Sequence, residues 1–231
     1  MADDILYRRS NLASLPQLGE LAPEPFQAAM RFFASATAEG VLSSKEKELV
    51  ATAVSHATEC PYCIDSHTRK AHAAGASAAE VAEAIFVGAA LKAGGAYTHA
   101  ANALQAFYGE GDDVLYRRTN LAQLKKLGEL APEPVKAALQ FFEKATAPGV
   151  LSKTFKEIIA VAVAHVTECP YCIDLHTQAA KAAGATAEAL VEAILVGASV
   201  KAGGTLTHAT HALAVLQELQ AVGSPAAAVR A

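Results

Sequence analysis

The sequence has no tryptophan, only two methionines and only four cysteines in 231 residues, and it contains no run of basic residues. A disulfide-stabilised scaffold needs a far higher share of cysteine, so that class of protein is excluded. Nucleic-acid binding requires clustered lysine and arginine, whereas 19 basic residues here face 23 acidic ones and the net charge is −4. What remains is a mildly acidic, alanine-rich chain that is 52% hydrophobic, a composition that predicts a folded protein.

Long hydrophobic runs and targeting segments are also missing from the sequence. The first four residues include two aspartates and no basic region followed by an apolar run, so we expect no secretory signal. The most apolar stretches, 84–91 and 193–200, are each followed by a lysine within a few positions and are shorter than the roughly 18 residues that cross a bilayer. We therefore expect a cytoplasmic protein without membrane contact, and in that compartment paired cysteines are usually catalytic or metal-binding.

The chain repeats itself at an offset of 109 residues. The segment Cys60–Cys63 recurs as Cys169–Cys172, about 66 aligned positions are identical, and no insertion is needed between Asp3 and Phe107. A period of this kind indicates one structural unit written twice. We therefore predict two tandem repeats, residues 1–108 and 109–217, followed by a tail, 218–231, that we expect to be flexible.

Helix signals recur along each repeat. The prolines at 23 and 25 suit the first turn of a helix that we expect to span about residues 23 to 38. Ser43–Glu46 and Ser77–Glu80 have the capping-box pattern, and the pair Gly94–Gly95 predicts a break before a last helix. No stretch alternates apolar and polar residues for long enough to form a strand. We predict an all-α fold of two helical repeats packed as a pseudo-twofold pair.

The two cysteines of each repeat are predicted to lie at a helix N-terminus. Pro61 suits the first helical position, which makes Cys60 the N-cap and places the Cys63 thiol one turn away on the same face. The unpaired N–H groups and the helix dipole favour a thiolate over a thiol there. His67 follows Cys63 by four residues, so its imidazole can accept the Cys63 proton.

A glutamate on the preceding helix is predicted to face this histidine. The two helices must run antiparallel around a turn near Thr58, which lies ten residues after Glu48 and nine before His67. A carboxylate opposite the imidazole would orient it and stabilise its cationic form. The candidate catalytic residues of the first repeat are therefore Glu48, Cys60, Cys63 and His67, and those of the second are Glu157, Cys169, Cys172 and His176.

Other roles are open for several of these residues. Thiolates and imidazole also suit zinc, although the second ligand pair would have to come from the other repeat. Glu48 could be a solvated helix residue, because Glu46 and Lys47 beside it are typical of a surface. In that case Glu59, next to Cys60, is the alternative acid.

The remaining histidines lie outside the motif. One pair precedes the cysteines by four residues, where capping of helix carbonyls or tuning of the thiol is expected: His56 and His165. A second pair, on the last helix of each repeat, is expected to serve packing or an interface: His99 and His208. The other two occur in one repeat only, so no shared mechanism needs them: His72 and His211.

The spacing Glu48-x11-Cys60-x2-Cys63-x3-His67 resembles the core motif of the AhpD-like alkylhydroperoxidase branch of the carboxymuconolactone decarboxylase superfamily. The resemblance covers most of each repeat. It implies a thiol-dependent peroxidase or disulfide reductase in which Cys63 attacks peroxide and Cys60 resolves the sulfenic acid to a disulfide. It also implies no cofactor beyond the redox-active disulfides, Cys60–Cys63 and Cys169–Cys172, and an unidentified dithiol as electron donor.

One position departs from the motif, because the AhpD enzymes have a histidine between the cysteines and this chain has Tyr62 and Tyr171. A phenol, with a reference pKa near 10, is a poor proton shuttle, so weaker peroxidase turnover is expected. The decarboxylases of the superfamily lack the cysteine pair, so lactone decarboxylation is not expected.

Two functions follow from the sequence. The first is an antioxidant oxidoreductase that acts on a hydroperoxide or a disulfide and forms a homotrimer mimicking a hexamer of single repeats. The alternative is a non-catalytic helical assembly or binding protein whose thiols sense redox state or clip a metal.

Overall fold

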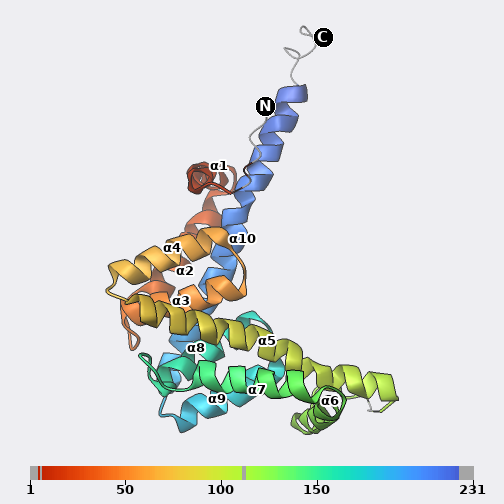
Figure 1. Cartoon of the computed structure of the whole chain (residues 1–231). Coiled ribbons are helices and arrows are strands. Elements are labelled where there is room, and N and C mark those ends of the chain that lie inside the picture. The colour runs from red at the N-terminus through yellow and green to blue at the C-terminus, as the bar shows by residue number, and fades with distance from the viewer. Residues whose placement is uncertain (1–4, 6, 111–112, 224–231) are drawn as a thin grey trace.

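The computed structural model describes residues 5, 7–110 and 113–223, and over these residues it is all-α, as predicted (Figure 1). The first repeat begins with a short 3-10 helix and continues with five α-helices: η1 (Arg9–Ser14), α1 (Pro16–Leu21), α2 (Pro23–Thr37), α3 (Ser44–Ala57), α4 (Pro61–Ala73) and α5 (Ala78–Tyr108). The second repeat has the same order: η2 (Arg118–Gln123), α6 (Leu124–Leu130), α7 (Pro132–Thr146), α8 (Lys153–Val166), α9 (Pro170–Ala182) and α10 (Ala187–Gly223). The predicted flexible tail overlaps α10 up to Gly223, and its remaining residues, 224–231, lie outside the described residues.

The local signals in the sequence set most helix ends. Ser43 and Ser77 cap α3 and α5 in complete capping boxes with Glu46 and Glu80, which confirms both predictions. In the second repeat Ser152 still accepts a hydrogen bond from the backbone N–H of Phe155, but the glutamate of the box is absent. Helices α3 and α8 therefore begin at equivalent residues although the sequences differ, because the N-cap serine alone satisfies a backbone N–H that would otherwise be unpaired.

The predicted break at Gly94–Gly95 is wrong, since α5 continues without interruption from Ala78 to Tyr108, and α10 passes through the equivalent pair Gly203–Gly204. Glycine inside a helix costs about 1 kcal/mol relative to alanine. Here each helix is held on several sides by other helices, and Gly95 is buried between them. The second glycine of each pair, Gly95 or Gly204, brings the helix backbone close to the cysteines and does not change the helix direction.

The two repeats exchange their long last helices. Helices α3 and α8 form the centre of the core and pack against each other, with Leu49, Val50, Ile159 and Val163 fully buried. Helix α5 packs on α3 but also on α8, α7 and α9 of the second repeat, while α10 packs on α8 and on α3, α2 and α4 of the first. Each repeat is therefore completed by the other, and in Figure 1 α5 and α10 both project beyond this shared core.

Reciprocal polar contacts show the pseudo-twofold relation. The Glu83 carboxylate on α5 accepts hydrogen bonds from the backbone N–H groups of Val150 and Leu151, at 3.0 and 2.8 Å. The Glu192 carboxylate on α10 does the same for Val41 and Leu42, at 2.9 Å each. Paired contacts of this kind, i to j and j to i, are the signature of a twofold arrangement, so the predicted pairing of the repeats is confirmed.

One helix in the described part of the chain, α10, is long and apolar enough to span a membrane by length and composition, over Ala187–Leu219 with a hydropathy of 1.4. The sequence reading missed this length because it expected a break at the glycine pair. The helix packs on four α-helices and on η1, and 39% of its most apolar stretch is buried in the protein. The core helix of a soluble protein passes the same test of length and composition, so this test alone does not identify α10 as a membrane span.

Candidate active site

Both cysteines of the first repeat are positioned by the start of α4. Cys60 is the N-cap with extended backbone angles, Pro61 is the first helical residue, and the Cys63 N–H donates to Cys60 Sγ at 3.2 Å, as predicted. Glu59, just before, has φ 58°, a left-handed conformation that non-glycine residues seldom adopt. Glu168 has the same angle before Cys169, so a sharp turn directs each cysteine into the core.

The predicted carboxylate–imidazole pair forms in both repeats. His67 Nδ1 lies 2.7 Å from Glu48 Oε2, and His176 Nδ1 lies 2.7 Å from Glu157 Oε2. Because Nδ1 carries the proton toward the carboxylate, Nε2 of each ring is left to exchange a proton with another group. Glu48 is buried, so the alternative of a solvated helix residue does not hold.

The two carboxylates differ in one further partner. Lys153, one turn before Glu157 on α8, donates to Glu157 Oε1 at 2.6 Å, whereas serine occupies the equivalent position 44 in the first repeat. Burial of Glu157 opposes its ionisation, but hydrogen bonds from His176 and Lys153 outweigh this and hold its pKa below the usual value. The second site therefore shares its carboxylate charge between an imidazole and an ammonium.

Glu59, the alternative acid, points elsewhere. Its carboxylate is 76% exposed and pairs with Lys92 of α5, and Glu168 likewise pairs with Lys201 of α10. Neither carboxylate reaches the imidazole of the motif, which is already paired. These surface pairs instead link the turn before each cysteine to α5 or α10.

The sequence reading missed the residues that cover the sulfur atoms, because they come from the other repeat. Thr207 of α10 places its hydroxyl 3.7 Å from Cys60 Sγ, and Thr98 of α5 lies 3.4 Å from Cys169 Sγ and 3.9 Å from Cys172 Sγ. A Cβ atom at Gly204 would lie 3.5 Å from Cys63 Sγ and 3.6 Å from Cys60 Sγ, in van der Waals contact with both, so the α10 backbone packs directly on the sulfur atoms. The sequence signal that could have found them is that the same threonine and glycine occur at equivalent positions in both repeats.

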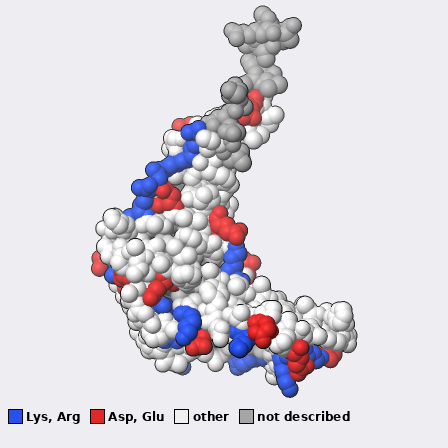
Figure 2. Space-filling model, viewed as in Figure 1, with Lys and Arg blue, Asp and Glu red and all other residues white. Residues whose placement is uncertain are grey.

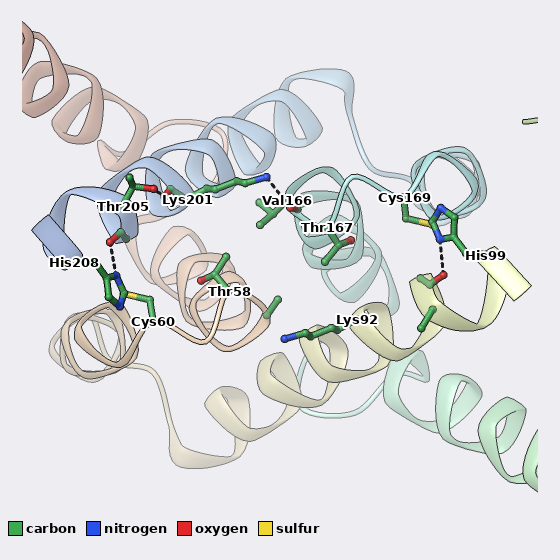
Figure 3. A pocket seen from close by; sticks show the side chains of 14 residues that line it. Thr58, Cys60, Lys92, His99, Val166, Thr167, Cys169, Lys201, Thr205 and His208 are labelled. Carbon is green, nitrogen blue, oxygen red and sulfur yellow. Dashed lines mark hydrogen bonds between the residues drawn. The ribbon is translucent and has the colours of Figure 1, made fainter. Parts of the chain in front are cut away.

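Histidines of the same two helices stand beside the N-cap cysteines. His208 and His99, which the sequence assigned to packing or an interface, donate Nδ1–H to the carbonyls of Gly204 and Gly95 at 2.7 Å. Figure 3 shows the His208 ring next to Cys60 and the His99 ring next to Cys169. Their Nε2 atoms are thus available to the thiol chemistry.

The surroundings of each pair make the first cysteine the stronger acid. A hydrogen bond from the Cys63 thiol lowers the pKa of Cys60 to about 5, assisted by the Cys63 backbone N–H, Thr207 and the charge of His208. The same bond to Cys60, together with burial, raises the pKa of Cys63. Cys169 and Cys172 repeat this division, with the pKa of Cys169 lowered to about 5. All four cysteines are buried free thiols in the structure.

The two cysteines of a pair open onto different spaces. Cys60 and Cys169 line one cavity of about 770 Å³ between the repeats, with Lys92 and Lys201 between the two sulfurs (Figure 3). Cys63 lines a separate pocket of about 340 Å³ together with His67, under apolar residues of α2 and α10. Cys172 and His176 line an equivalent pocket of about 330 Å³ under α7 and α5. Each cysteine pair therefore separates an outer pocket from the central cavity.

The histidines that precede the cysteines act within their own helices. His56 Nδ1 bonds the carbonyl of Thr52, and His165 Nδ1 bonds the carbonyl of Val161, each at 2.8 Å. This confirms the prediction that His56 and His165 bind carbonyl groups of the helix. Among the residues that the structure describes, no three His, Cys, Asp or Glu side chains gather as a metal site.

The repeats also differ beside the intervening tyrosines. Tyr171 donates its hydroxyl proton to Asn102 of α5 at 2.8 Å. The equivalent position on α10 is His211, whose ring packs 4.9 Å from that of Tyr7 and 6.2 Å from that of Tyr62. The Nε2 atom of His211 is buried without a hydrogen-bond partner among the described residues. The first site therefore holds an imidazole where the second holds an amide.

Fold and site together define a tandem-repeat, all-helical protein with two carboxylate–histidine–dithiol sites. The model of the Carboxymuconolactone decarboxylase family matches residues 23–106 and 132–217, which is more than half of the chain. The protein belongs to this family, and the two matched segments confirm the duplication.

Relatives of the chain carry several descriptions. An uncharacterized protein 4 in the cox locus of Paracoccus denitrificans is 53% identical over 73 residues, which span 32% of this chain and 66% of that protein. An uncharacterized protein of Cupriavidus necator is 33% identical over 110 residues, 47% of this chain and 97% of its own length, so it has the size of one repeat. The alkyl hydroperoxide reductase AhpD of Rhizorhabdus wittichii is 32% identical over 99 residues, 43% of this chain and 53% of that enzyme.

A solved structure has the same overall fold. The crystal structure of a putative gamma-carboxymuconolactone decarboxylase subunit from Burkholderia xenovorans superposes with a TM-score of 0.66 at 20% identity, over 92% of this chain and 96% of its own. At this identity the likeness concerns the fold alone. The family resemblance predicted from the sequence is confirmed.

Proposed function

We propose that this protein is a thiol-dependent peroxidase or disulfide reductase with one site in each repeat. The observation that carries the proposal is the placement of Cys63 and the Glu48-bonded His67 in one apolar pocket, repeated by Cys172 and His176. An apolar pocket excludes water and accommodates the organic part of a hydroperoxide, while the imidazole supplies the one proton that the reaction must move.

The first step consumes the peroxide. The pair loses its first proton easily, and the two sulfurs share the proton that remains, so the Cys63 thiolate forms when that proton passes to His67. The thiolate attacks the terminal peroxide oxygen, the O–O bond breaks, and Cys63 becomes a sulfenic acid. The alkoxide leaves as the alcohol with a proton from the His67 imidazolium, which Glu48 stabilises.

The second step closes the disulfide. The Cys60 thiolate attacks the Cys63 sulfur, the S–S bond forms as the S–O bond breaks, and the hydroxide leaves as water with a proton from solvent, which replaces the one that the pair released first. A dithiol donor then reduces the disulfide and becomes a disulfide itself, so the cycle converts hydroperoxide and dithiol into alcohol, water and oxidised donor. Because Cys60 is the more acidic thiol, it is the better leaving group when the donor attacks Cys63. A dithiol pool of this kind fits the cytoplasm, where we place the protein.

The test is peroxide consumption with several dithiol donors. Replacing both outer cysteines, Cys63→Ser with Cys172→Ser, should abolish turnover. Replacing both N-cap cysteines, Cys60→Ser with Cys169→Ser, should leave a single turnover that consumes one peroxide per site and accumulates sulfenic acid. Undiminished turnover in the first double variant would refute the proposal, and no peroxide consumption by the wild-type protein with any donor would favour the non-catalytic alternative.

We also propose that three chains assemble into a ring, as predicted from the sequence. Equivalent apolar residues are exposed in both repeats, with Val41 and Val150 at 58% and 59% and Phe86 and Leu195 at 57% and 44% exposure. Charged residues lie scattered between wide uncharged areas on the face shown in Figure 2. Exposed apolar surface related by the pseudo-twofold axis suits repeated contacts between copies. Light scattering should give three times the mass of one chain, and the mass of a single chain would contradict the assembly.

A further inference from the structure

The two outer pockets are built from equivalent residues but carry opposite charges. The pocket over Cys63 and the pocket over Cys172 share an apolar wall at positions related by the 109-residue offset: Leu12 and Leu121, Leu15 and Leu124, Phe33 and Phe142. Two lining positions differ in charge between the pockets. Lys70 lines the first pocket where the second repeat has Ala179, and Glu143 lines the second pocket where the first repeat has Ala34.

Lys70 lies on the same stripe of α4 as the reactive groups. Cys63, His67 and Lys70 are spaced i, i+4 and i+7, so they line one face of the helix. At 1.5 Å per residue, the Lys70 backbone is roughly 10 Å along the axis from Cys63. Lys70 is exposed and has no ion-pair partner among the described residues. The first pocket therefore runs from a buried thiol to a cation at its mouth.

The second pocket ends in an anion instead. Glu143 of α7 is exposed and has no ion-pair partner within the described ranges. No lysine or arginine lines this pocket, and Leu175 replaces the Ser66 hydroxyl of the first pocket. A ligand carboxylate would meet repulsion here rather than attraction.

Resting on the proposed peroxidase function, we infer that the two sites divide their substrates by charge. The site of Cys63 takes hydroperoxides that carry a carboxylate, and the site of Cys172 takes uncharged ones. The Cys63 and Lys70 backbones lie roughly 10 Å apart along α4, and an extended chain advances about 1.2 Å per bond, so about eight bonds between the peroxide and the carboxylate would cover that separation. The substrate class of the first site is thus a medium-chain hydroperoxy carboxylic acid.

The experiment uses enzymes with one working site. Cys169→Ser with Cys172→Ser leaves the first site, and Cys60→Ser with Cys63→Ser leaves the second. Each is assayed with a medium-chain hydroperoxy carboxylic acid and with its methyl ester, and the readout is the acid-to-ester ratio of kcat/KM. We expect a ratio about three- to tenfold higher at the first site than at the second, falling as salt is added.

Three variants assign the effect to the named side chains. In the first-site enzyme, Lys70→Ala should remove most of the preference for the acid and Ala34→Glu should reverse it. In the second-site enzyme, Glu143→Ala should raise the acid-to-ester ratio. Lys125→Ala removes an exposed lysine of α6 that lines neither outer pocket, and it is the matched control that should leave the ratio unchanged.

The two proposals fail in different ways. Equal acid-to-ester ratios at the two working sites would overturn the division of substrates while leaving the peroxidase function intact. If neither substrate is turned over, the peroxidase proposal fails, and the pockets are compared through protection of Cys63 and Cys172 from a neutral alkylating reagent. Octanoate should then protect Cys63 several-fold better than methyl octanoate does and should not protect Cys172, and equal protection would overturn the inference.

Discussion

The hydroxyl that α5 of the first repeat places against Cys169 of the second should control the acidity of that thiol. Thr98 Oγ1 lies 3.4 Å from Cys169 Sγ and also 3.1 Å from the carbonyl oxygen of Gly95. The hydroxyl has one proton, which can turn from the carbonyl to the sulfur when Cys169 ionises. Thr98→Val keeps the shape of the side chain and removes this donor, so the thiolate becomes less stable and its pKa rises.

The magnitude follows from the hydrogen bond that is lost. A hydrogen bond to a charged group contributes about 1.5 to 3 kcal/mol, and the competing carbonyl places this one at the low end. Since about 1.4 kcal/mol corresponds to one pKa unit, the pKa of Cys169 should move from about 5 to roughly 6. At pH 6 the thiolate fraction should then fall from about nine tenths to about one half.

The assay is a pH titration of the ultraviolet thiolate absorbance in the Cys60→Ser, Cys63→Ser background, where only the second pair titrates. Thr98→Ser should restore the low midpoint because it keeps the hydroxyl. Thr207→Val is the matched control, since Thr207 covers the other site. A shift below about a third of a unit in Thr98→Val, or an equal shift in Thr207→Val, would refute the claim that each repeat tunes the thiols of the other.

Three further predictions concern the carboxylate and two glycines. Glu48→Gln removes the charge that orients and stabilises the His67 imidazolium, so in the first-site enzyme peroxide reduction should slow by about a hundredfold, and an unchanged rate would contradict the assigned role. Gly88→Ala brings a Cβ to 2.8 Å from the carbonyl oxygen of Ala53 and should lower the free energy of unfolding by about 1 to 3 kcal/mol. Gly94→Ala meets nothing within 4 Å and should stabilise a continuous helix by roughly 1 kcal/mol in urea unfolding, whereas destabilisation would contradict that continuity.

Local signals predicted the parts of the site that lie on one helix or on one hairpin. The N-cap position of Cys60 follows from the proline after it, and the pairing of Glu48 with His67 follows from equal distances on either side of a turn. Both are short-range consequences of helix geometry, so spacing in the sequence sufficed. The break predicted at Gly94–Gly95 was wrong because a helix packed on several sides tolerates glycine where an isolated helix would break.

The sequence by itself determined the duplication, the all-α class, the two cysteine pairs and the carboxylate–histidine partner of each, because these depend on periodicity and on contacts within one hairpin. Only the tertiary structure decided which surfaces close the sites. Thr98 and Thr207 reach the sulfurs of the opposite repeat because the long helices α5 and α10 cross between repeats, and such packing is set by the shape of buried surfaces far apart in the chain. The opposite charges of Lys70 and Glu143 can likewise affect the two sites only because the fold places each residue in the lining of a pocket that contains a thiol.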